Sequence, residues 1–157
     1  MKNVLVTGGC GFIGSNFVQY LISCRNYFPV ILDKLTYAGN ITNLDQADKK
    51  KYAFIKGDIC DKKLVNDLFI KYKFKGVFNF AAESHVDRSI DDPIYFIKNN
   101  INSATNLFHA YNKYYKLKKI KLFHISTDEV YGSIKKGEFR EHDTYNPSSP
   151  YSASKAS

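Results

Sequence analysis

Short, mostly apolar runs alternate with helix-like patterns along the chain. The runs have the length of buried strands, and they cover residues 3–7, 29–33, 52–55, 76–80 and 120–126. After the first run, Ile13, Phe17 and Leu21 recur at helical spacing and predict one face of a helix. Strand–helix alternation with continuous apolar strands predicts an α/β fold, a doubly wound parallel sheet with helices on both faces.

Cap signals mark the later helices. Asp61 can cap a second helix, and Asp92 followed by Pro93 starts a third, which we expect to run to about Tyr115. The loop at residues 147–150 leads into a final helix that, we expect, hardly begins.

Composition limits the class of protein. The length of 157 residues and the hydrophobic content of 44% predict that residues 1–157 form one domain with one core. The net charge is +8, but the basic residues are dispersed, which favours a solvated surface over a nucleic-acid site. No apolar run reaches membrane-spanning length, and the N-terminus shows no signal peptide, so we expect a cytoplasmic protein. Three separated cysteines, Cys10, Cys24 and Cys60, predict free thiols and no metal site.

A glycine-rich loop follows the first predicted strand. Gly8, Gly11 and Gly14 open the first helix, where backbone can approach a pyrophosphate and the helix N-terminus attracts its charge. An ordinary tight turn is the alternative. Asp33 weakens it, because a carboxylate at the end of the second strand can bind both adenosine ribose hydroxyls and repels a 2′-phosphate. The pattern predicts a Rossmann-type domain that binds NAD rather than NADP.

The third strand ends at Asp58 and Ile59, where such sheets often contact adenine. A simple turn before the helix that Asp61 caps is an equally good interpretation.

A Tyr-x-x-x-Lys pair lies near the end of the chain. In a helix, Tyr151 and Lys155 are one turn apart on one face, and the ammonium is expected to lower the pKa of the phenol. The phenolate could then remove a hydroxyl proton while a hydride leaves for NAD. Ser126 or Thr127, at the end of the fifth strand, could hydrogen-bond the same hydroxyl.

Two further groups follow strand ends. Past the fifth strand, a turn can aim Asp128 and Glu129 at one pocket as an acid and a base, although a loop cap with a solvated charge is the plainer interpretation. His85 follows the fourth strand, on the side of the sheet where ligands bind, and the small residues Ala81 and Ala82 allow close cofactor approach.

These segments resemble the N-terminal part of the dTDP-glucose 4,6-dehydratases, which are extended short-chain dehydrogenase/reductases. The resemblance covers the whole chain, and its matching segments are residues 7–15, 33–40, 81–90, 126–132 and 147–157. It implies conversion of dTDP-glucose or UDP-glucose to the 4-keto-6-deoxy sugar through a transient NADH, in a cytoplasmic homodimer. The sequence does not choose between the two nucleotides.

The resemblance also implies roles for individual residues. Tyr151, with Lys155, takes the O4 proton, and Thr127 hydrogen-bonds O4. Glu129 removes the C5 proton and Asp128 protonates the departing C6 hydroxyl. His85 lies near the substrate. The implied cofactor-binding residues are Gly8, Gly11, Phe12, Ile13, Gly14, Asp33, Lys34, Leu35, Thr36, Asp58, Ile59, Ala81, Ala82, Glu83, Ser84, Asn100, Tyr151 and Lys155.

Departures from the family pattern qualify this expectation. Cys10 replaces the usual alanine, and Ser103-Ala104 replaces Gly-Thr. The family is about twice as long, so we expect a fold truncated before the last strands, with the C-terminal substrate domain absent and the fragment inactive alone. The alternatives are an NAD-dependent nucleotide-sugar epimerase, which needs no acid/base pair for loss of water, and a non-catalytic nucleotide-binding domain.

Overall fold

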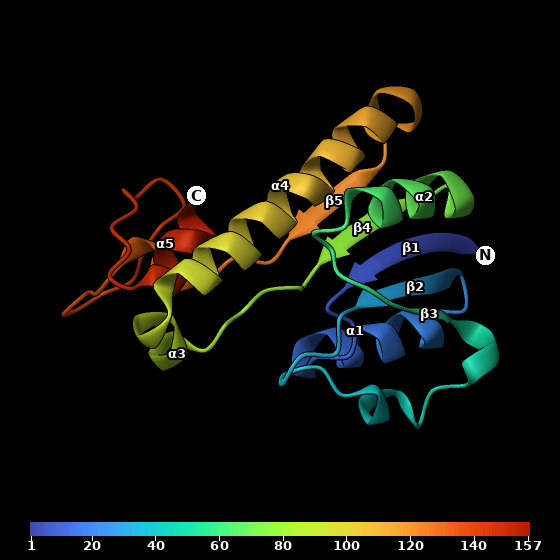
Figure 1. The fold of residues 1–157 in the computed structure, drawn as a ribbon, viewed down its shortest axis with the longest axis horizontal. Coiled ribbons are helices and arrows are strands. Elements are labelled where there is room, and N and C mark those ends of the chain that lie inside the picture. The colour runs from blue at the N-terminus through green and yellow to red at the C-terminus, as the bar shows by residue number, and fades with distance from the viewer. The chain divides into compact units, whose positions relative to one another are not determined.

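The computed structural model describes residues 1–157, apart from the side chains of residues 117 and 118. The chain forms five strands, five α-helices and three short 3₁₀ turns. Figure 1 shows the arrangement of the strands and α-helices. The strands are β1 (Lys2–Thr7), β2 (Tyr27–Asp33), β3 (Ala53–Lys56), β4 (Gly76–Asn79) and β5 (Lys121–His124). The α-helices are α1 (Phe12–Ser23), α2 (Lys62–Tyr72), α3 (Val86–Asp91), α4 (Pro93–Lys118) and α5 (Pro150–Ala156). The 3₁₀ turns are η1 (Ile41–Leu44), η2 (Lys49–Lys51) and η3 (Asp128–Tyr131).

The five strands form one parallel sheet in the order β3-β2-β1-β4-β5. From β1 the chain first builds outward through β2 and β3, and it then crosses to the other side of β1 to build β4 and β5. The strand order therefore reverses between β1 and β4, and ligands of open α/β sheets bind outside the carboxyl ends of the strands at such a point. The predicted Rossmann-type sheet is confirmed.

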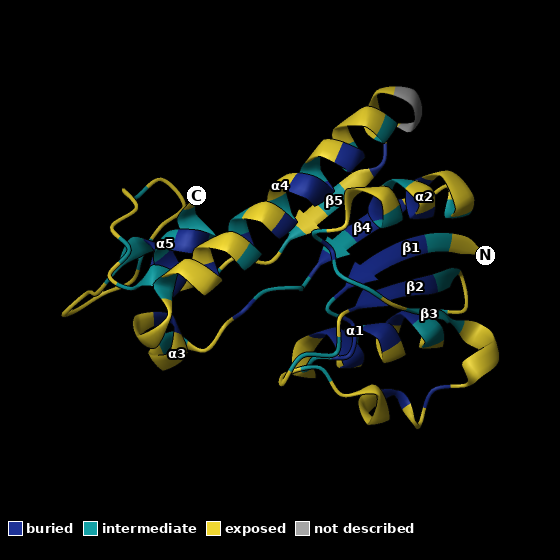
Figure 2. Cartoon of the chain, in the orientation of Figure 1, coloured by how far each residue is buried: buried dark blue, intermediate teal, exposed yellow. Residues whose placement is uncertain are grey.

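Each face of the sheet has its own core. Val4, Val6 and Ile31 pack with Val18 and Leu21 of α1 on one face. On the other face, the intervening strand residues pack with α2 and with the C-terminal part of α4, and this core contains Leu5, Val30, Leu32, Val65, Leu68, Phe69, Leu107 and Ala110. Figure 2 shows the buried residues concentrated along β1 and β2. Alternate residues of central strands thus serve opposite cores, which explains why their sequences are apolar without interruption.

The first turn of α1 departs from the predicted helix face. Ile13 is 60% exposed, whereas Gly14 and Ser15 are buried. The helix approaches the sheet through these small residues, so the apolar periodicity marks the wrong face at this end. Farther along the helix Leu21 is buried, as predicted.

The final helix was predicted wrongly. Alpha-helix α5 is formed over Pro150–Ala156, and Ser149 and Ser152 form a reciprocal capping box at its start. Tyr151 and Ser154 are buried. Caps and packing offset the unfavourable nucleation that a short helix faces in isolation.

The chain divides into two compact units. The first unit contains residues 1–81 and 105–125, and the second contains residues 82–104 and 126–157. Alpha-helix α4 contributes to both. The assignment of residues 1–157 to a single NAD-binding domain stays a prediction. Among the residues that the structure describes, no helix has both the length and the apolar character needed to cross a bilayer.

Candidate functional site

Two of the three loop glycines are required by the protein's own packing. Gly8 has a φ of 67°, and a Cβ atom there would lie 2.7 Å from the backbone nitrogen of Ala81. A Cβ atom on Gly14 would lie 2.2 Å from the carbonyl oxygen of Gly8. Both clashes are with backbone, which cannot move aside. These glycines bring the loop against α1 and against the segment after β4.

Gly11 differs from Gly8 and Gly14, because no steric clash within the protein requires a glycine at this position. A Cβ atom there would meet only the carbonyl oxygens of Gly8 at 3.4 Å and Ala38 at 3.9 Å. Gly11 is the N-cap of the 12-residue helix α1, and it has no side chain to occupy the N–H groups of the first turn. Free N–H groups at a helix start favour an anion, and a glycine lets it come close. The loop therefore fits the pyrophosphate of a dinucleotide.

Asp33 closes this loop at the end of β2. Its side chain is buried, and its two carboxylate oxygens accept the backbone N–H groups of Cys10 at 2.9 Å and Leu35 at 2.8 Å. Leu35 has a φ of 56°, a strained conformation for a branched side chain that is typical of functional turns. A carboxylate has about four acceptor positions, so the fixed Asp33 retains capacity for two ribose hydroxyls.

Cys10 lies in the loop, but its thiol is unreactive at neutral pH. Its side chain is fully buried, and burial, together with the negative charge of Asp33, raises the pKa of the thiol to about 12. The reactive species of a cysteine is the thiolate, which is negligible at neutral pH for such a thiol.

The turn after β3 is held by contacts of its own. Asp58 accepts the Cys60 N–H at 2.8 Å and pairs with Lys34 at 2.7 Å. Burial by itself would raise the pKa of Asp58, but hydrogen bonds and the charge of Lys34 outweigh burial and lower it. As predicted, Asp61 caps α2 by accepting the Leu64 N–H. Contact of Asp58 and Ile59 with adenine stays a prediction.

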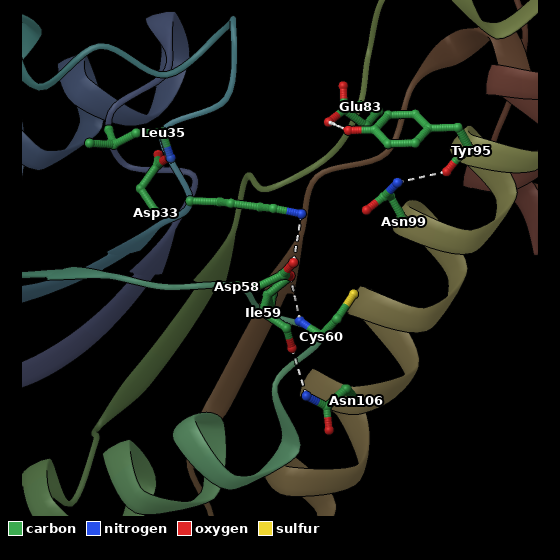
Figure 3. Close-up of polar contacts among 10 residues, drawn as sticks. Asp33, Leu35, Asp58, Ile59, Cys60, Glu83, Tyr95, Asn99 and Asn106 are labelled. Atoms are coloured by element: carbon green, nitrogen blue, oxygen red, sulfur yellow. Dashed lines mark hydrogen bonds and ion pairs between the residues drawn. The ribbon is translucent and has the colours of Figure 1, made fainter. Parts of the chain in front are cut away.

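Asn106 completes this turn, and the sequence reasoning missed it. Its amide nitrogen donates to the carbonyl oxygen of Ile59 at 2.6 Å, as Figure 3 shows. The only signal in the sequence was an asparagine on the buried face of a helix, next to Leu107. That signal is weak, because its partner is a backbone atom 47 residues away.

In the second unit, the segment after β4 is fixed by α4. The Glu83 backbone N–H donates to Oδ1 of Asn100 at 2.8 Å, and its carbonyl accepts from Nδ2 of Asn100 at 2.9 Å. The buried Glu83 carboxylate accepts the Tyr95 hydroxyl at 3.1 Å (Figure 3). Ser84 and His85 are exposed, and His85 is the N-cap of α3.

The two predicted acid/base carboxyls lie on the turn η3, beyond β5. Thr127 is the N-cap of this turn, and its hydroxyl accepts the Glu129 N–H at 3.3 Å. Asp128 is exposed, Glu129 is half-buried and the next residue, Val130, anchors the turn in the interior. The neighbouring carboxyls therefore have different environments, which is a condition for dividing the roles of acid and base.

Tyr151 and Lys155 lie one turn apart on α5, and the expected direction of the Tyr151 pKa shift is wrong. Burial raises the pKa of the phenol, a hydrogen bond from Thr127 opposes this, and the charges of Glu129 and Asp128 add to the rise. Burial also lowers the pKa of Lys155. The protein environment alone thus favours the neutral phenol over the phenolate.

The predicted residues divide between the two units. The first unit holds Gly8, Gly11, Phe12, Ile13, Gly14, Asp33, Lys34, Leu35, Thr36, Asp58, Ile59 and Ala81. The second unit holds Ala82, Glu83, Ser84, His85, Asn100, Thr127, Asp128, Glu129, Tyr151 and Lys155. The predicted nucleotide-binding loop and the predicted acid/base residues are thus each assembled within one unit.

The sequence model of the family described as GDP-mannose 4,6 dehydratase matches residues 5–157. The chain belongs to this family. A relative from Neisseria gonorrhoeae, named dTDP-glucose 4,6-dehydratase, is 47% identical over 99% of this chain and 47% of its own length. The chain spans about half the length of the curated relatives that it matches.

Solved structures of two kinds of enzyme are similar to the chain. A dTDP-glucose 4,6-dehydratase from Streptomyces venezuelae, with NAD and TYD bound, has a TM-score of 0.90 and 40% identity, covering 98% of this chain and 48% of that one. A Thermus thermophilus UDP-glucose 4-epimerase in complex with NAD has a TM-score of 0.86 and 35% identity, covering 98% and 47%. Both similarities extend over almost the whole chain, so fold alone does not separate dehydratase from epimerase.

Proposed function

We propose that the protein containing this chain is an NAD-dependent nucleotide-sugar 4,6-dehydratase, a hydro-lyase that converts dTDP-glucose or UDP-glucose to the 4-keto-6-deoxy sugar. The observation that carries the proposal is the turn η3. This turn carries two adjacent carboxyl groups, those of Asp128 and Glu129. It begins at Thr127, whose side chain also hydrogen-bonds the Tyr151 phenol. The relatives named dTDP-glucose 4,6-dehydratase support it.

The residues of the first unit fit NAD. Gly11 and the start of α1 would receive the pyrophosphate, and the fixed carboxylate of Asp33 would receive the adenosine ribose. Bound there, NAD would supply the hydride acceptor for C4 of the sugar and the hydride that C6 later receives.

The second unit supplies the proton transfers. Tyr151 takes the proton from the sugar O4, and Thr127 hydrogen-bonds the same oxygen. A ketone at C4 acidifies the C5–H bond, so Glu129 can remove that proton. Asp128 then protonates the departing C6 hydroxyl, so that water leaves, and C5 recovers a proton as C6 receives the hydride, which gives the 4-keto-6-deoxy sugar. Because burial favours the neutral phenol, Tyr151 depends on the Thr127 hydrogen bond and on the Lys155 ammonium to release its proton.

An NAD-dependent nucleotide-sugar 4-epimerase is the second candidate, favoured by the likeness to UDP-glucose 4-epimerases. Epimerisation removes no water and needs no counterpart of Asp128 and Glu129. Supplying the full-length protein with NAD and either dTDP-glucose or UDP-glucose distinguishes the two. A 4-keto-6-deoxy product supports the dehydratase, whereas a C4 epimer without loss of water contradicts it.

We expect the chain to bind NAD about tenfold or more tightly than NADP, because the Asp33 carboxylate would repel a 2′-phosphate. Asp33→Asn should weaken NAD binding and reduce the ratio of NAD affinity to NADP affinity. Titration of both cofactors by calorimetry measures this. Asp67→Asn is the matched control, since Asp67 is an exposed carboxylate paired with Lys63 on the outer face of α2. Equal binding of both cofactors by the unaltered chain would contradict the role of Asp33.

The 157-residue chain by itself should form no 4-keto-6-deoxy sugar, since the matched dehydratases are about twice as long. Incubating the purified chain with NAD and each nucleotide-glucose checks this, and substantial product would contradict it. We also expect the full-length protein to be a cytoplasmic homodimer.

A further inference from the structure

The N-terminus of α5 has an unusual hydrogen-bond partner. The first N–H groups of a helix have no partner within the helix. In α5, Pro150 has no N–H, and the Ser152 N–H is accepted by the Ser149 hydroxyl at 3.0 Å. The Tyr151 N–H instead reaches another element, the Ser89 hydroxyl of α3, at 3.2 Å.

The surroundings of Ser89 orient its hydroxyl for this contact. It is fully buried, and its hydroxyl donates to the carbonyl of Val86 at 2.6 Å. Since a hydroxyl has one hydrogen, that bond fixes its orientation and leaves a lone pair for the Tyr151 N–H. Alpha-helices α3 and α5 pack against each other within the second unit.

The carbonyl group of Tyr151 is held as well. It accepts the Ser154 hydroxyl at 2.7 Å, and the Ser154 oxygen accepts Nδ2 of Asn100 at 2.8 Å. The same Asn100 amide holds both backbone groups of Glu83. Both backbone groups of Tyr151 are therefore bound to buried serine hydroxyls, one on α3 and one tied to α4.

We propose that Ser89, assisted by Ser154, is a positioning residue that fixes the backbone of Tyr151 and thereby aims its phenol at the reacting sugar hydroxyl. The proposal rests on the proposed function for the identity of that hydroxyl. The phenol needs such anchors, because proton transfer requires placement to about an ångström and a misplacement of that size costs about 100-fold in rate.

The test compares Ser89→Ala and Ser154→Ala in the full-length protein with NAD bound. Ser103→Ala is the matched control, because Ser103 is also a buried serine whose hydroxyl donates to a carbonyl three residues back, that of Asn100, without touching Tyr151. We expect both test variants to lose about 10- to 100-fold in kcat, with KM and NAD affinity within about twofold of wild type. Ser89→Thr, which keeps the hydroxyl, should recover part of the loss.

A second measurement does not depend on turnover. Tyrosine labelled with ¹³C at Cζ reports the ionisation of Tyr151 by NMR, and Tyr151→Phe assigns its signal. Burial raises the pKa of Tyr151, so a loosened phenol in Ser89→Ala should titrate closer to the ordinary value of about 10, while Ser103→Ala should titrate like wild type.

The outcomes separate the two proposals. If Ser89→Ala lowers kcat no more than Ser103→Ala and leaves the Tyr151 titration unchanged, Ser89 has a structural role only. If a Ser89 variant does not fold, as melting and NAD titration would show, Ser154→Ala decides from the carbonyl side. If the wild-type protein makes no 4-keto-6-deoxy sugar but Ser89→Ala shifts the titration, the proposed function fails and the positioning role stands.

Discussion

Glu129→Gln is expected to lower formation of the 4-keto-6-deoxy sugar by roughly 10²–10⁴-fold in the full-length protein, because an amide cannot accept the C5 proton. The variant should keep the turn η3, since Thr127 caps it through the backbone N–H of residue 129. Tyr151 and Lys155 are untouched, so oxidation at C4 should still occur. The reaction is followed by the absorbance of the reduced cofactor together with chromatography of the sugar product.

The expected result is reduced cofactor held on the protein with little product. Glu138→Gln is the control, because it makes the same change at an exposed glutamate nine positions along the chain. Turnover at the wild-type rate in Glu129→Gln would show that another group is the base. Loss of both C4 oxidation and product would instead indicate a damaged site.

Substitution by alanine should mainly lower stability at Gly14 and mainly weaken NAD binding at Gly11. Gly14→Ala should lower the free energy of unfolding by about 1–3 kcal/mol or more, because its Cβ atom would lie 2.2 Å from the Gly8 carbonyl oxygen. Gly11→Ala should cost no more than about 1 kcal/mol, the usual penalty for alanine at an N-cap, because its Cβ atom has room. It should nevertheless weaken NAD binding about tenfold or more, since the methyl group would occupy the approach to the helix N-terminus.

Urea unfolding and NAD titration of the two variants separate these effects. A Gly11→Ala chain that unfolds as early as Gly14→Ala would mean that packing, not a ligand, requires the glycine. A Gly11→Ala chain that binds NAD like wild type would remove the loop from the cofactor site.

Local chemistry could be read directly from the sequence where neighbours in the chain decide it. The Asp61 cap and the start of α4 at Pro93 follow from residues within three positions of each other. Helix α3 was not predicted because six residues offer too little periodicity, and Asn106 was missed because its partner is a backbone carbonyl distant in sequence.

The sequence by itself determined the alternation of strands and helices, the glycine loop and the identity of the chemical groups, because apolar period and side-chain type are local properties. Tertiary structure decided three things that local pattern cannot. Burial and two carboxyls raised the Tyr151 pKa where the Lys155 spacing suggested a fall. Buried packing and a capping box formed α5 where the loop pattern suggested a helix that hardly begins. The Tyr151 backbone found its partner on α3, 62 residues away, because folding alone sets which distant groups meet.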